Sequence, residues 1–344
     1  MARKSVKNMD SILKNYLAEV SLGTPASYGS MIVLPVFAPP VAVEHEYLLM
    51  QEAMDFGVLT ITEVSEAGSV PQLMAVNSGK KAILLIDGEQ LVGAKQDRVL
   101  NTTVMLAPES KTVIPVSCTE HGRWWYSSRE FRSADYVMSS SSRRRKMRSV
   151  SDSLKRKDSY EGDQRGVWDE IANLNRKSGA RSPTGAMKDS FAEKNHDVEK
   201  LVYAFPLQPH QRGILVFVCD GVYIGFEMVS REDVFPKIYK KILRSYTIDA
   251  VLTHPSPDKV NFAGKAKDFL GDVKNCSSDP HPSVGLGMDY RFNSIGLTGH
   301  ALVHDKEPVY MSFYSTNDPI RQPSSERGDF REQRPHGMHR SAKV

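Results

Sequence analysis

The sequence predicts an α+β fold with a large antiparallel β-sheet, barrel-like or sandwich-like, against which a few amphipathic helices pack. Short apolar runs recur between turn residues, as in "MIVLPVF" and "VLTITEV", and this pattern is typical of strands. After residue 163, apolar side chains recur every three or four positions, as a helix facing a core requires. With 344 residues and 40% hydrophobic composition, the chain is long enough to bury such a core.

The strands are expected in adjacent pairs. "AILLIDGEQLVGA" (82–94) has two apolar runs around Asp87-Gly88, which is a strong hairpin signal. "VLNTTVMLAP" and "TVIPVSC" predict a second hairpin, with its turn at 108–111. "GILVFVCDGVYIGFEMV" predicts a third around Asp220-Gly221, and residues 289–315 close the core in strands.

Helices are expected where the apolar period lengthens. "YLLMQEAMDFG" (47–57) predicts a short one, and "DQRGVWDEIANLNRK" predicts another with Val167, Ile171 and Leu174 on one stripe. Ser182 is a candidate N-cap, because Pro183 would then occupy the first helical position. "SREDVFPKIYKKILRSYTIDAVL" predicts a capped amphipathic helix.

Composition predicts the domain boundaries. We expect an N-terminal helical extension at 1–29, a single domain at 30–316 and a disordered tail at 317–344. A basic, Ser/Arg-rich insertion is expected at about 132–163, because "SSSSRRRKMRSVSDSLKRK" (139–157) offers almost no apolar surface. The sequence therefore predicts a linker or long loop over Ser139 to Lys157.

This basic segment has two interpretations. Its cationic side chains could make a weak contact with nucleic-acid phosphates through Arg143, Arg144, Arg145 and Lys146. The alternative is a solvated, flexible insertion, which the lack of interleaved aromatic residues favours.

Several classes of protein are excluded at this level. The N-terminus lacks the continuous apolar run of a signal peptide, and no run approaches membrane-spanning length, so a cytoplasmic protein with no membrane partner is expected. Three widely spaced cysteines give no disulfide framework. His300 and His304 would lie about 13 Å apart in a strand, and Asp279 with His281 falls in a proline-containing loop, so neither a metal nor a cofactor is expected.

The order of several motifs carries a family resemblance. "DGEQLVGAKQDRVLNTTVMLAPESKTVIPVSCTEHGRW" is followed by "VWDEIA", "RSPTGAM", "ILRSYTIDAV" and "GMDYRF". In this order the chain resembles the bacterial and archaeal family of ADP-ribosylglycohydrolase- and rhodanese-phosphatase-associated proteins, over roughly 30–315. The resemblance implies association with enzymes of NAD and ADP-ribose metabolism, but no particular reaction. The Ser/Arg-rich stretch departs from the family pattern and indicates an insertion.

Three residues are candidates for catalysis. Glu89 and Glu120 each stand at a strand end beside a turn, where two carboxylates could share acid and base roles in glycosidic hydrolysis. The alternative is a pair of solvated turn glutamates. Cys118 could act as a nucleophile, although strand alternation directs it away from His121, and a buried packing role is the favoured interpretation.

The same region offers groups for an anionic ligand. An arginine fork suits a pyrophosphate, amides add donors, an indole can stack on a base, and a helix start adds free N–H groups. The expected ligand-binding residues are Gln96, Arg98, Asn101, His121, Arg123, Trp124, Ser182 and Thr184. Ordinary capping and surface ion pairs are the alternative.

The sequence therefore predicts an intracellular enzyme or sensor for an ADP-ribose-like or other nucleotide-derived, phosphate-bearing ligand. As an enzyme it would hydrolyse a nucleotide or ADP-ribose-type glycosidic bond. The alternative is a non-catalytic scaffold that recruits a protein or nucleic acid through edge strands and the basic segment. An enzyme requires the residues between Glu89 and Trp124 to line one cleft.

Overall fold

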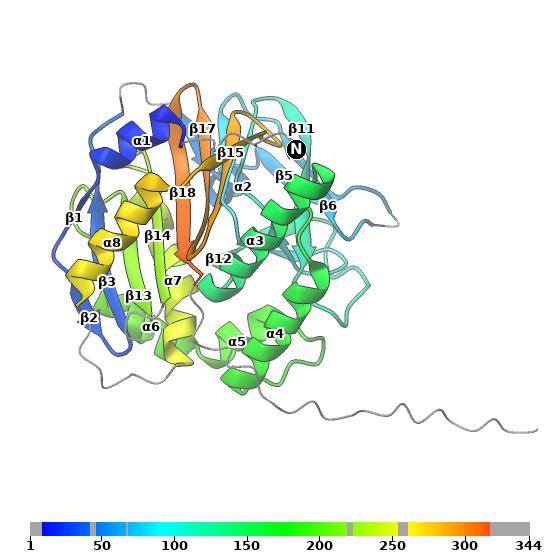
Figure 1. Cartoon of the computed structure of the whole chain (residues 1–344). Coiled ribbons are helices and arrows are strands. Elements are labelled where there is room, and N and C mark those ends of the chain that lie inside the picture. The colour runs from blue at the N-terminus through cyan, green and yellow to red at the C-terminus, as the bar shows by residue number, and fades with distance from the viewer. Residues whose placement is uncertain (1–8, 42–45, 67, 219–222, 254–260, 317–344) are drawn as a thin grey trace, which may run out of the picture.

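The computed structural model describes residues 9–41, 46–66, 68–218, 223–253 and 261–316. Within these residues, helices surround three β-sheets, of nine, six and three strands (Figure 1). The α+β fold with a large antiparallel sheet is therefore confirmed. The predicted tail at 317–344 and the Asp220-Gly221 turn lie outside the described residues.

The nine-stranded sheet forms the centre of the molecule, and its strands are all antiparallel. Its order is β1-β3-β13-β14-β18-β17-β16-β15, with β2 paired to β3. The strands are β1 (Ser21–Leu22), β2 (Ala26–Tyr28), β3 (Met31–Phe37), β13 (Gly213–Val218), β14 (Tyr223–Val229), β15 (Ser278–Pro282), β16 (Met288–Ser294), β17 (Leu297–His304) and β18 (Glu307–Ser315). The predicted pairing of the two runs around Asp220-Gly221 is confirmed, because β13 pairs with β14.

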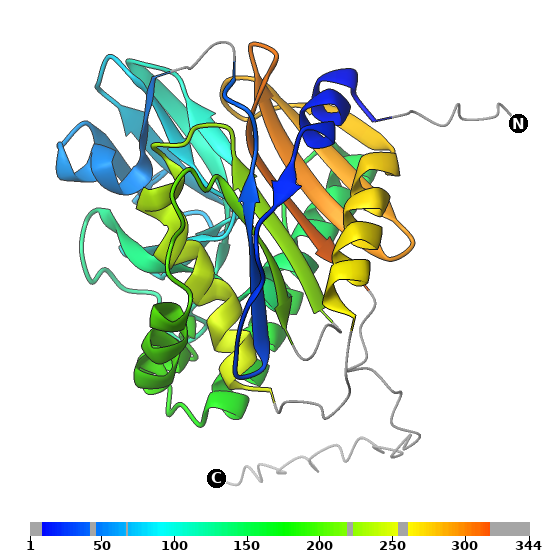
Figure 2. The same ribbon diagram turned by 90° about the vertical axis from the view of Figure 1, so that its left-hand side faces the viewer.

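The large sheet separates two apolar cores. Helices α1 (Ser11–Ala18) and α8 (Phe262–Asn275) pack on one face, where Leu13 and Phe269 meet Phe217 and Phe313. Helix α7 (Phe235–Val251) covers the other face, and Figure 2 shows the sheet between α8 and α7. Helix α7 was predicted from the helical spacing of its apolar residues. The helix buries a stripe of these residues that includes Ile238, Ile242 and Tyr246. Its predicted cap is wrong, because the N-cap residue Val234 makes no side-chain capping bond.

The two smaller sheets are formed by residues 47–137. The six-stranded order is β12-β8-β9-β11-β6-β5 and the three-stranded order is β10-β7-β4. The strands are β4 (Tyr47–Leu49), β5 (Leu59–Glu63), β6 (Gln72–Asn77), β7 (Ala82–Leu85), β8 (Glu89–Gly93), β9 (Arg98–Leu100), β10 (Val104–Leu106), β11 (Ser110–Cys118) and β12 (Phe131–Val137). All neighbouring pairs are antiparallel except β4 with β7.

The hairpin predicted at Asp87-Gly88 is wrong. The two apolar runs form β7 and β8, but β7 pairs with β10 and β4, whereas β8 pairs with β9 and β12. The turn therefore carries the chain from one sheet to another. Gly88 adopts a φ of +82°, and a Cβ there would lie 2.5 Å from Arg143 Nε, so glycine serves a close approach rather than a solvent-exposed turn.

The second predicted hairpin is confirmed in part. The start of its first run pairs with its second run, because β9 pairs with β11, but the rest of the first run forms β10, which belongs to the three-stranded sheet. The side chain of Asn77 binds the carbonyl oxygens of Lys81 and Ala107 and so holds the point where the chain changes sheets. Turn chemistry located these bends but could not identify the strand partners.

The remaining helices lie at several places around the sheets: Figure 1 shows α4, α5 and α6 in its lower part and α2 in its upper part. They are α2 (Met50–Asp55), α3 (Ser140–Lys157), α4 (Gln164–Ser178), α5 (Met187–Glu193) and α6 (Asn195–Ala204). Helix α4 buries the predicted stripe of Val167, Ile171 and Leu174. The helix start predicted at Ser182 is wrong: α5 begins at Met187, and the Ser182 hydroxyl accepts a bond from the Ala186 amide in the preceding turn.

The linker predicted over Ser139 to Lys157 is wrong, because this segment forms the 18-residue helix α3. Ser139 caps its start, arginine and lysine have good helix propensity, and the basic last turn suits the negative end of the helix dipole. Met147, Val150 and Leu154 form a buried stripe at helical spacing. These three apolar residues anchor a helix whose other side chains are almost all polar.

The N-terminal segment divides into two parts. The described part of the extension predicted at 1–29 contains α1, but β1 and β2 already pair with β3 in the large sheet.

Among the described residues, every helix is too short or too polar to traverse a lipid bilayer.

Candidate functional site

Glu120 and Arg123 are brought together at the end of β11. Arg123 donates to Glu120, to Asp97 Oδ1 at 3.1 Å, and to the carbonyl oxygens of Gly93 and Ala94. Burial alone would raise the pKa of Glu120, but hydrogen bonds from Arg123, Thr184 and the Asp97 amide hold it below its usual value. We call Asp97, Glu120, Arg123 and Thr184 the Glu120 network. Its charges are paired within the protein.

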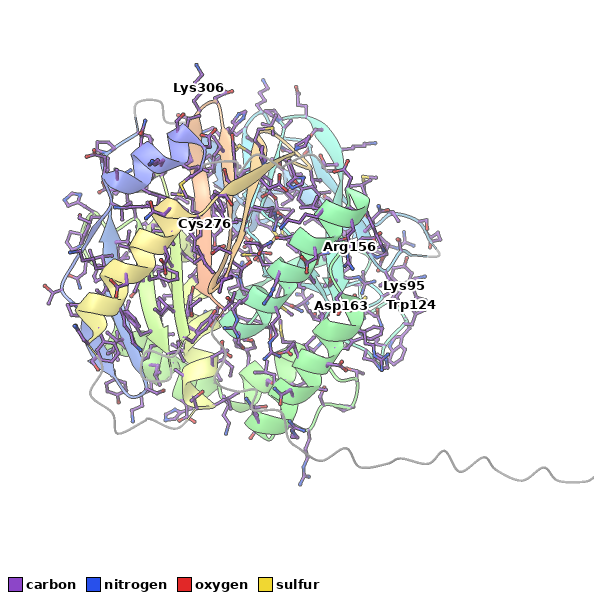
Figure 3. The ribbon with its side chains drawn as sticks, viewed as in Figure 1. Lys95, Trp124, Arg156, Asp163, Cys276 and Lys306 are labelled. Atoms are coloured by element: carbon purple, nitrogen blue, oxygen red, sulfur yellow. The ribbon has the colours of Figure 1, made fainter. Side chains whose placement is uncertain are left out.

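Arg98 and Trp124 lie beside this network. Arg98 is fully buried, and its Nη1 donates to the backbone and side-chain oxygens of Gln96. Among the described residues, its Nε and Nη2 find no hydrogen-bond partner, although Nη2 lies 3.7 Å from Glu63. Trp124 is 46% exposed and stacks with Lys95, whose Nζ lies 5.5 Å from the ring centre (Figure 3).

Glu89 and Asn101 take no part in the Glu120 network. Glu89 accepts from the Ile86 amide and from Lys241 on α7, whose amine also binds Ser133. Asn101 bonds to Ser117 and to the Tyr160 carbonyl oxygen. Glu89 and Glu120 therefore have no hydrogen-bond partner in common among the described residues.

Cys118 is fully buried, and burial raises the pKa of its thiol to about 11. Its backbone exchanges two hydrogen bonds with the side chain of Gln164, the first residue of α4. The thiol is therefore protonated and inaccessible at neutral pH, as a packing role requires.

The other predicted ligand-binding residues join two loops. Thr184 donates to Glu120, and the Gly122 amide donates to the Thr184 carbonyl oxygen. His121 is exposed and contacts the ring of Trp168 edge-on, with ring centres 4.4 Å apart. Ser182 donates to Asp189 on α5. That a ligand binds among these residues stays a prediction.

A second group of buried charges lies between α3 and the large sheet. The Glu227 carboxylate on β14 accepts hydrogen bonds from two guanidinium nitrogens of Arg143, the nearer at 2.8 Å. It also accepts hydrogen bonds from the hydroxyls of Tyr246, Tyr310 and Tyr314. All five side chains are fully buried. These contacts hold the side chain of Arg143, a residue of α3, against the large sheet.

The group continues across the sheet as a row of polar residues. Cross-strand register places Glu227 opposite Ser312, Ser312 opposite His300, and His300 opposite Arg291, so all four share one face. Arg291 also binds Asp289, at 2.7 Å. Burial and nearby Arg291 lower the pKa of His300 to about 4, so its ring is neutral at pH 7.

Asp87 links this row to helix α3. Its Oδ1 contacts the Lys146 amine, which also donates to the Leu100 carbonyl oxygen at 2.7 Å, and its Oδ2 lies 3.6 Å from Arg143 Nε. Burial opposes the charge on Asp87, but Lys146 and Arg143 outweigh it and lower the pKa. The interior cluster comprises Asp87, Arg143, Lys146, Glu227, Asp289, Arg291, His300 and Ser312.

The interior cluster contains an unusual concentration of unpaired polar atoms. Among the described residues, hydrogen-bond partners are missing for Asp87 Oδ2, Arg143 Nε, Asp289 Oδ1, Arg291 Nε and Nη1, His300 Nδ1 and Ser312 Oγ. Buried polar atoms are normally satisfied, and clusters that are not are characteristic of functional sites or of ordered water.

A cleft of about 520 Å³ opens between α3 and α4, next to the interior cluster. We call it the α3–α4 cleft. Its lining residues are Met138, Ser142, Arg144, Arg145, Lys146, Arg148, Ser149, Asp163, Gly166, Val167, Asp169, Glu170 and Thr316. Helix α3 thus supplies a cationic wall and α4 an acidic one, and Lys146 belongs both to the cleft and to the interior cluster.

The cleft residues differ in how firmly they are held. Arg144 donates to the Ser315 carbonyl oxygen and stacks over Tyr223, and Arg145 forms an ion pair with Glu170. Arg148 is exposed and, within the described part of the chain, has no hydrogen bond or ion pair. Asp163 caps α4 through the Gly166 amide, and Figure 3 shows it beside α3.

The four residues expected to contact nucleic acid thus have different settings. Arg143 and Lys146 bind carboxylates of the interior cluster, and Arg144, Arg145 and Lys146 line the cleft. Sequence reasoning did not identify Asp87, Glu227, Asp289, Arg291 or His300 as parts of one site. A usable signal existed for Glu227, because a charged residue inside the apolar strand "YIGFEMV" must be paired when buried.

For metals, the described residues contain no group of three or more His, Cys, Asp or Glu side chains suited to an ion. His300 and His304 lie on one strand, as predicted. The loop predicted for Asp279 and His281 is instead strand β15, in which their side chains approach to 3.4 Å.

Comparison with known proteins gives one result. Residues 19–314 match the model of the ARG and Rhodanese-Phosphatase-superfamily-associated Protein domain. No curated protein and no solved structure gives a significant match. The match includes α3, so the basic segment falls within the matched range. The predicted family is confirmed, and ADP-ribosylglycohydrolase as the meaning of "ARG" stays a prediction.

Proposed function

The chain belongs to the ARG and Rhodanese-Phosphatase-superfamily-associated Protein domain family, and we propose that it binds a phosphate-bearing, nucleotide-type ligand in the α3–α4 cleft. The supporting observation is that Arg144, Arg145 and Arg148, three cationic residues of one helix, line a single cleft. Arginine donates two parallel charge-assisted bonds to phosphate oxygens.

The unequal pairing of these arginines supports the proposal. Arg148 has no protein partner among the described residues, so a ligand phosphate could engage it without breaking an existing contact. Arg145 would exchange its ion pair with Glu170 for one with phosphate. The hydroxyl of Ser142, which accepts a hydrogen bond from Ser139, adds a donor on the same wall.

The acidic wall suits the remainder of such a ligand. Asp163, Asp169 and Glu170 of the α4 region face the cleft. Carboxylates accept hydrogen bonds from the hydroxyls of a ribose, while they repel phosphate. The two walls therefore favour a ligand whose phosphate groups adjoin sugar hydroxyls, such as ADP-ribose, in which a diphosphate joins two riboses.

A thermal-shift titration tests the proposal with three probes: ADP-ribose, inorganic pyrophosphate and adenosine. A ligand at a hundred times its dissociation constant stabilises the folded state by about 2.7 kcal/mol. We expect a rise in melting temperature with ADP-ribose, a smaller one with pyrophosphate and none with adenosine. Equal shifts with adenosine and ADP-ribose, or no shift with any probe, contradict phosphate recognition.

A second candidate function is supported by a separate surface. Trp124, Trp125 and Tyr126 are consecutive and exposed, at 46%, 61% and 42%. Three adjacent exposed aromatic side chains are typical of surfaces that bind a protein or single-stranded nucleic acid. The scaffold alternative would then use this turn. Replacing both tryptophans by serine should abolish partner capture and leave the ADP-ribose shift unchanged.

A further inference from the structure

We propose that Lys146 is a nucleophilic amine that forms an imine with the carbonyl carbon of a phosphorylated aldehyde held in the α3–α4 cleft. The substrate class includes the open-chain form of a phosphorylated reducing sugar. The position of the phosphate rests on the proposed function, whereas the reactivity of the amine does not.

The position of Lys146 carries this inference. Lys146 lines the cleft in the same stretch of α3 as Arg144, Arg145 and Arg148, yet the residue is only 2% exposed. A carbonyl compound whose phosphate contacts these arginines therefore places its other end near the one buried lysine of the wall. Position alone distinguishes Lys146 from the exposed Lys155 on the same helix.

The surroundings of Lys146 favour the neutral amine. Burial lowers its pKa to about 8, and the positive charges of Arg143 and Arg291 act in the same direction, against the attraction of Asp87. At pH 7.5 roughly a quarter of such amines are neutral, compared with about one in a thousand for an ordinary lysine. Imine-forming lysines in proteins are activated in this way.

Asp87 supplies the proton acceptor and donor that imine formation needs. Its Oδ1 contacts the Lys146 amine, and its Oδ2 has no hydrogen-bond partner among the described residues. The amine lone pair forms the C–N bond, and Asp87 carries one proton from the nitrogen to the carbonyl oxygen, which becomes a hydroxyl. Asp87 then carries the second nitrogen proton to that hydroxyl, which leaves as water while the C=N bond forms. No oxidant or reductant is consumed.

The interior cluster holds Asp87 in place for this step. Arg143 lies 3.6 Å from Asp87 Oδ2, and Arg143 is itself fixed by Glu227 and its tyrosines. The Asp87 amide donates to Thr103. Arg143 and Glu227 are therefore positioning residues, because they hold Asp87 beside the Lys146 amine.

Labelling of the full chain with pyridoxal 5′-phosphate, a phosphorylated aldehyde, tests the inference. Borohydride reduction fixes the imine as a secondary amine, and peptide mass spectrometry then measures the modification of each lysine. We expect Lys146 to be labelled at least about tenfold more than Lys155 at pH 7.5, since its neutral fraction is larger. Labelling should rise between pH 7 and 9.

Three controls make the result specific. Pyridoxal, which lacks the phosphate, should label Lys146 much less, and Arg148→Gln should lower labelling by the phosphorylated probe. Lys146→Arg should lose the label and keep a native circular dichroism spectrum. Labelling of Lys146 no stronger than that of Lys155 in the folded wild-type chain overturns the inference.

Competition separates this inference from the proposed function. Protection of Lys146 by excess ADP-ribose supports both. Strong labelling without protection by ADP-ribose keeps the reactive amine and contradicts the nucleotide-type ligand. An Arg148-dependent thermal shift with ADP-ribose, together with an unlabelled Lys146, keeps the proposed function and overturns the imine.

Discussion

The Glu120 network and the α3–α4 cleft are both rich in charge, but only the cleft has charged groups left for a ligand. In the network, Arg123 donates hydrogen bonds to the carboxylates of Glu120 and Asp97 and to a backbone carbonyl oxygen. Both carboxylate oxygens of Glu120 accept hydrogen bonds, from Arg123 and from Thr184. In the cleft, Arg148 is exposed and has no partner among the described residues. Residue type is thus a weaker guide to binding than the partners that the chain itself supplies.

The largest effect should come from Glu227, the one carboxylate of the interior cluster whose partners among the described residues are as complete as those of the Glu120 network. Glu227→Ala leaves the Arg143 guanidinium and three tyrosine hydroxyls without their acceptor, so we expect a loss of about 3–5 kcal/mol in unfolding free energy. Urea denaturation measures it. Glu193→Ala, on the exposed end of α5, should change stability by less than about 0.5 kcal/mol. Equal effects of both variants would show that the cluster is not a paired unit.

The next effect concerns Arg123. Arg123→Lys keeps the charge but cannot reproduce the bonds to Glu120, Asp97 and two carbonyl oxygens, so we expect a loss of about 2–3 kcal/mol. The affinity for ADP-ribose should be unchanged. Weakened binding with unchanged unfolding free energy would instead make this network the ligand site.

Cys118→Ala should cost about 1 kcal/mol, because a small buried side chain is shortened in a packed core. Since burial raises the pKa of the thiol to about 11, iodoacetamide at pH 7.5 should alkylate Cys118 only after unfolding in urea. Rapid alkylation of the folded chain would contradict the packing role.

A smaller effect is expected for the pH dependence of Glu120. Its pKa is lower in the folded than in the unfolded state, so its carboxylate stabilises the fold above the unfolded pKa, and this contribution is lost as the pH falls through the folded pKa. The stability difference between wild type and Glu120→Gln should therefore shrink on acidification below about 4.5. A difference that does not change between pH 7 and pH 3 would show that the charge is irrelevant.

Local periodicity predicted much of the fold. The stripes of α4 and α7 and the strand β3 are present where the apolar pattern required them. The strand pairings around Asp87-Gly88 were not predictable from the two apolar runs, because β7 pairs with β10 and β4 and β8 pairs with β9 and β12. Long-range contacts of this kind leave no local signal.

The segment 139–157 shows the limit of composition. Its serines and arginines indicated a loop, yet Met147, Val150 and Leu154 share one face of a helix. Three apolar residues sufficed because the polar ones are also bound: Ser140 and Ser141 donate to Asp249 on α7, and Arg143 binds Glu227. The ligand-binding groups were therefore sought in 89–124 and at Ser182 and Thr184, whereas Arg148, which has no partner among the described residues, lies on this helix.

Calorimetric titration of ADP-ribose into Arg148→Gln and Arg156→Gln tests the central claim most directly. Both arginines are exposed on α3, but Arg148 lines the cleft, whereas Arg156 lies toward the far end of the helix (Figure 3). We expect Arg148→Gln to weaken binding about tenfold or more, as the loss of a charge-assisted hydrogen bond implies, and Arg156→Gln to bind like wild type. Equal affinities of the two variants would contradict phosphate binding in the α3–α4 cleft.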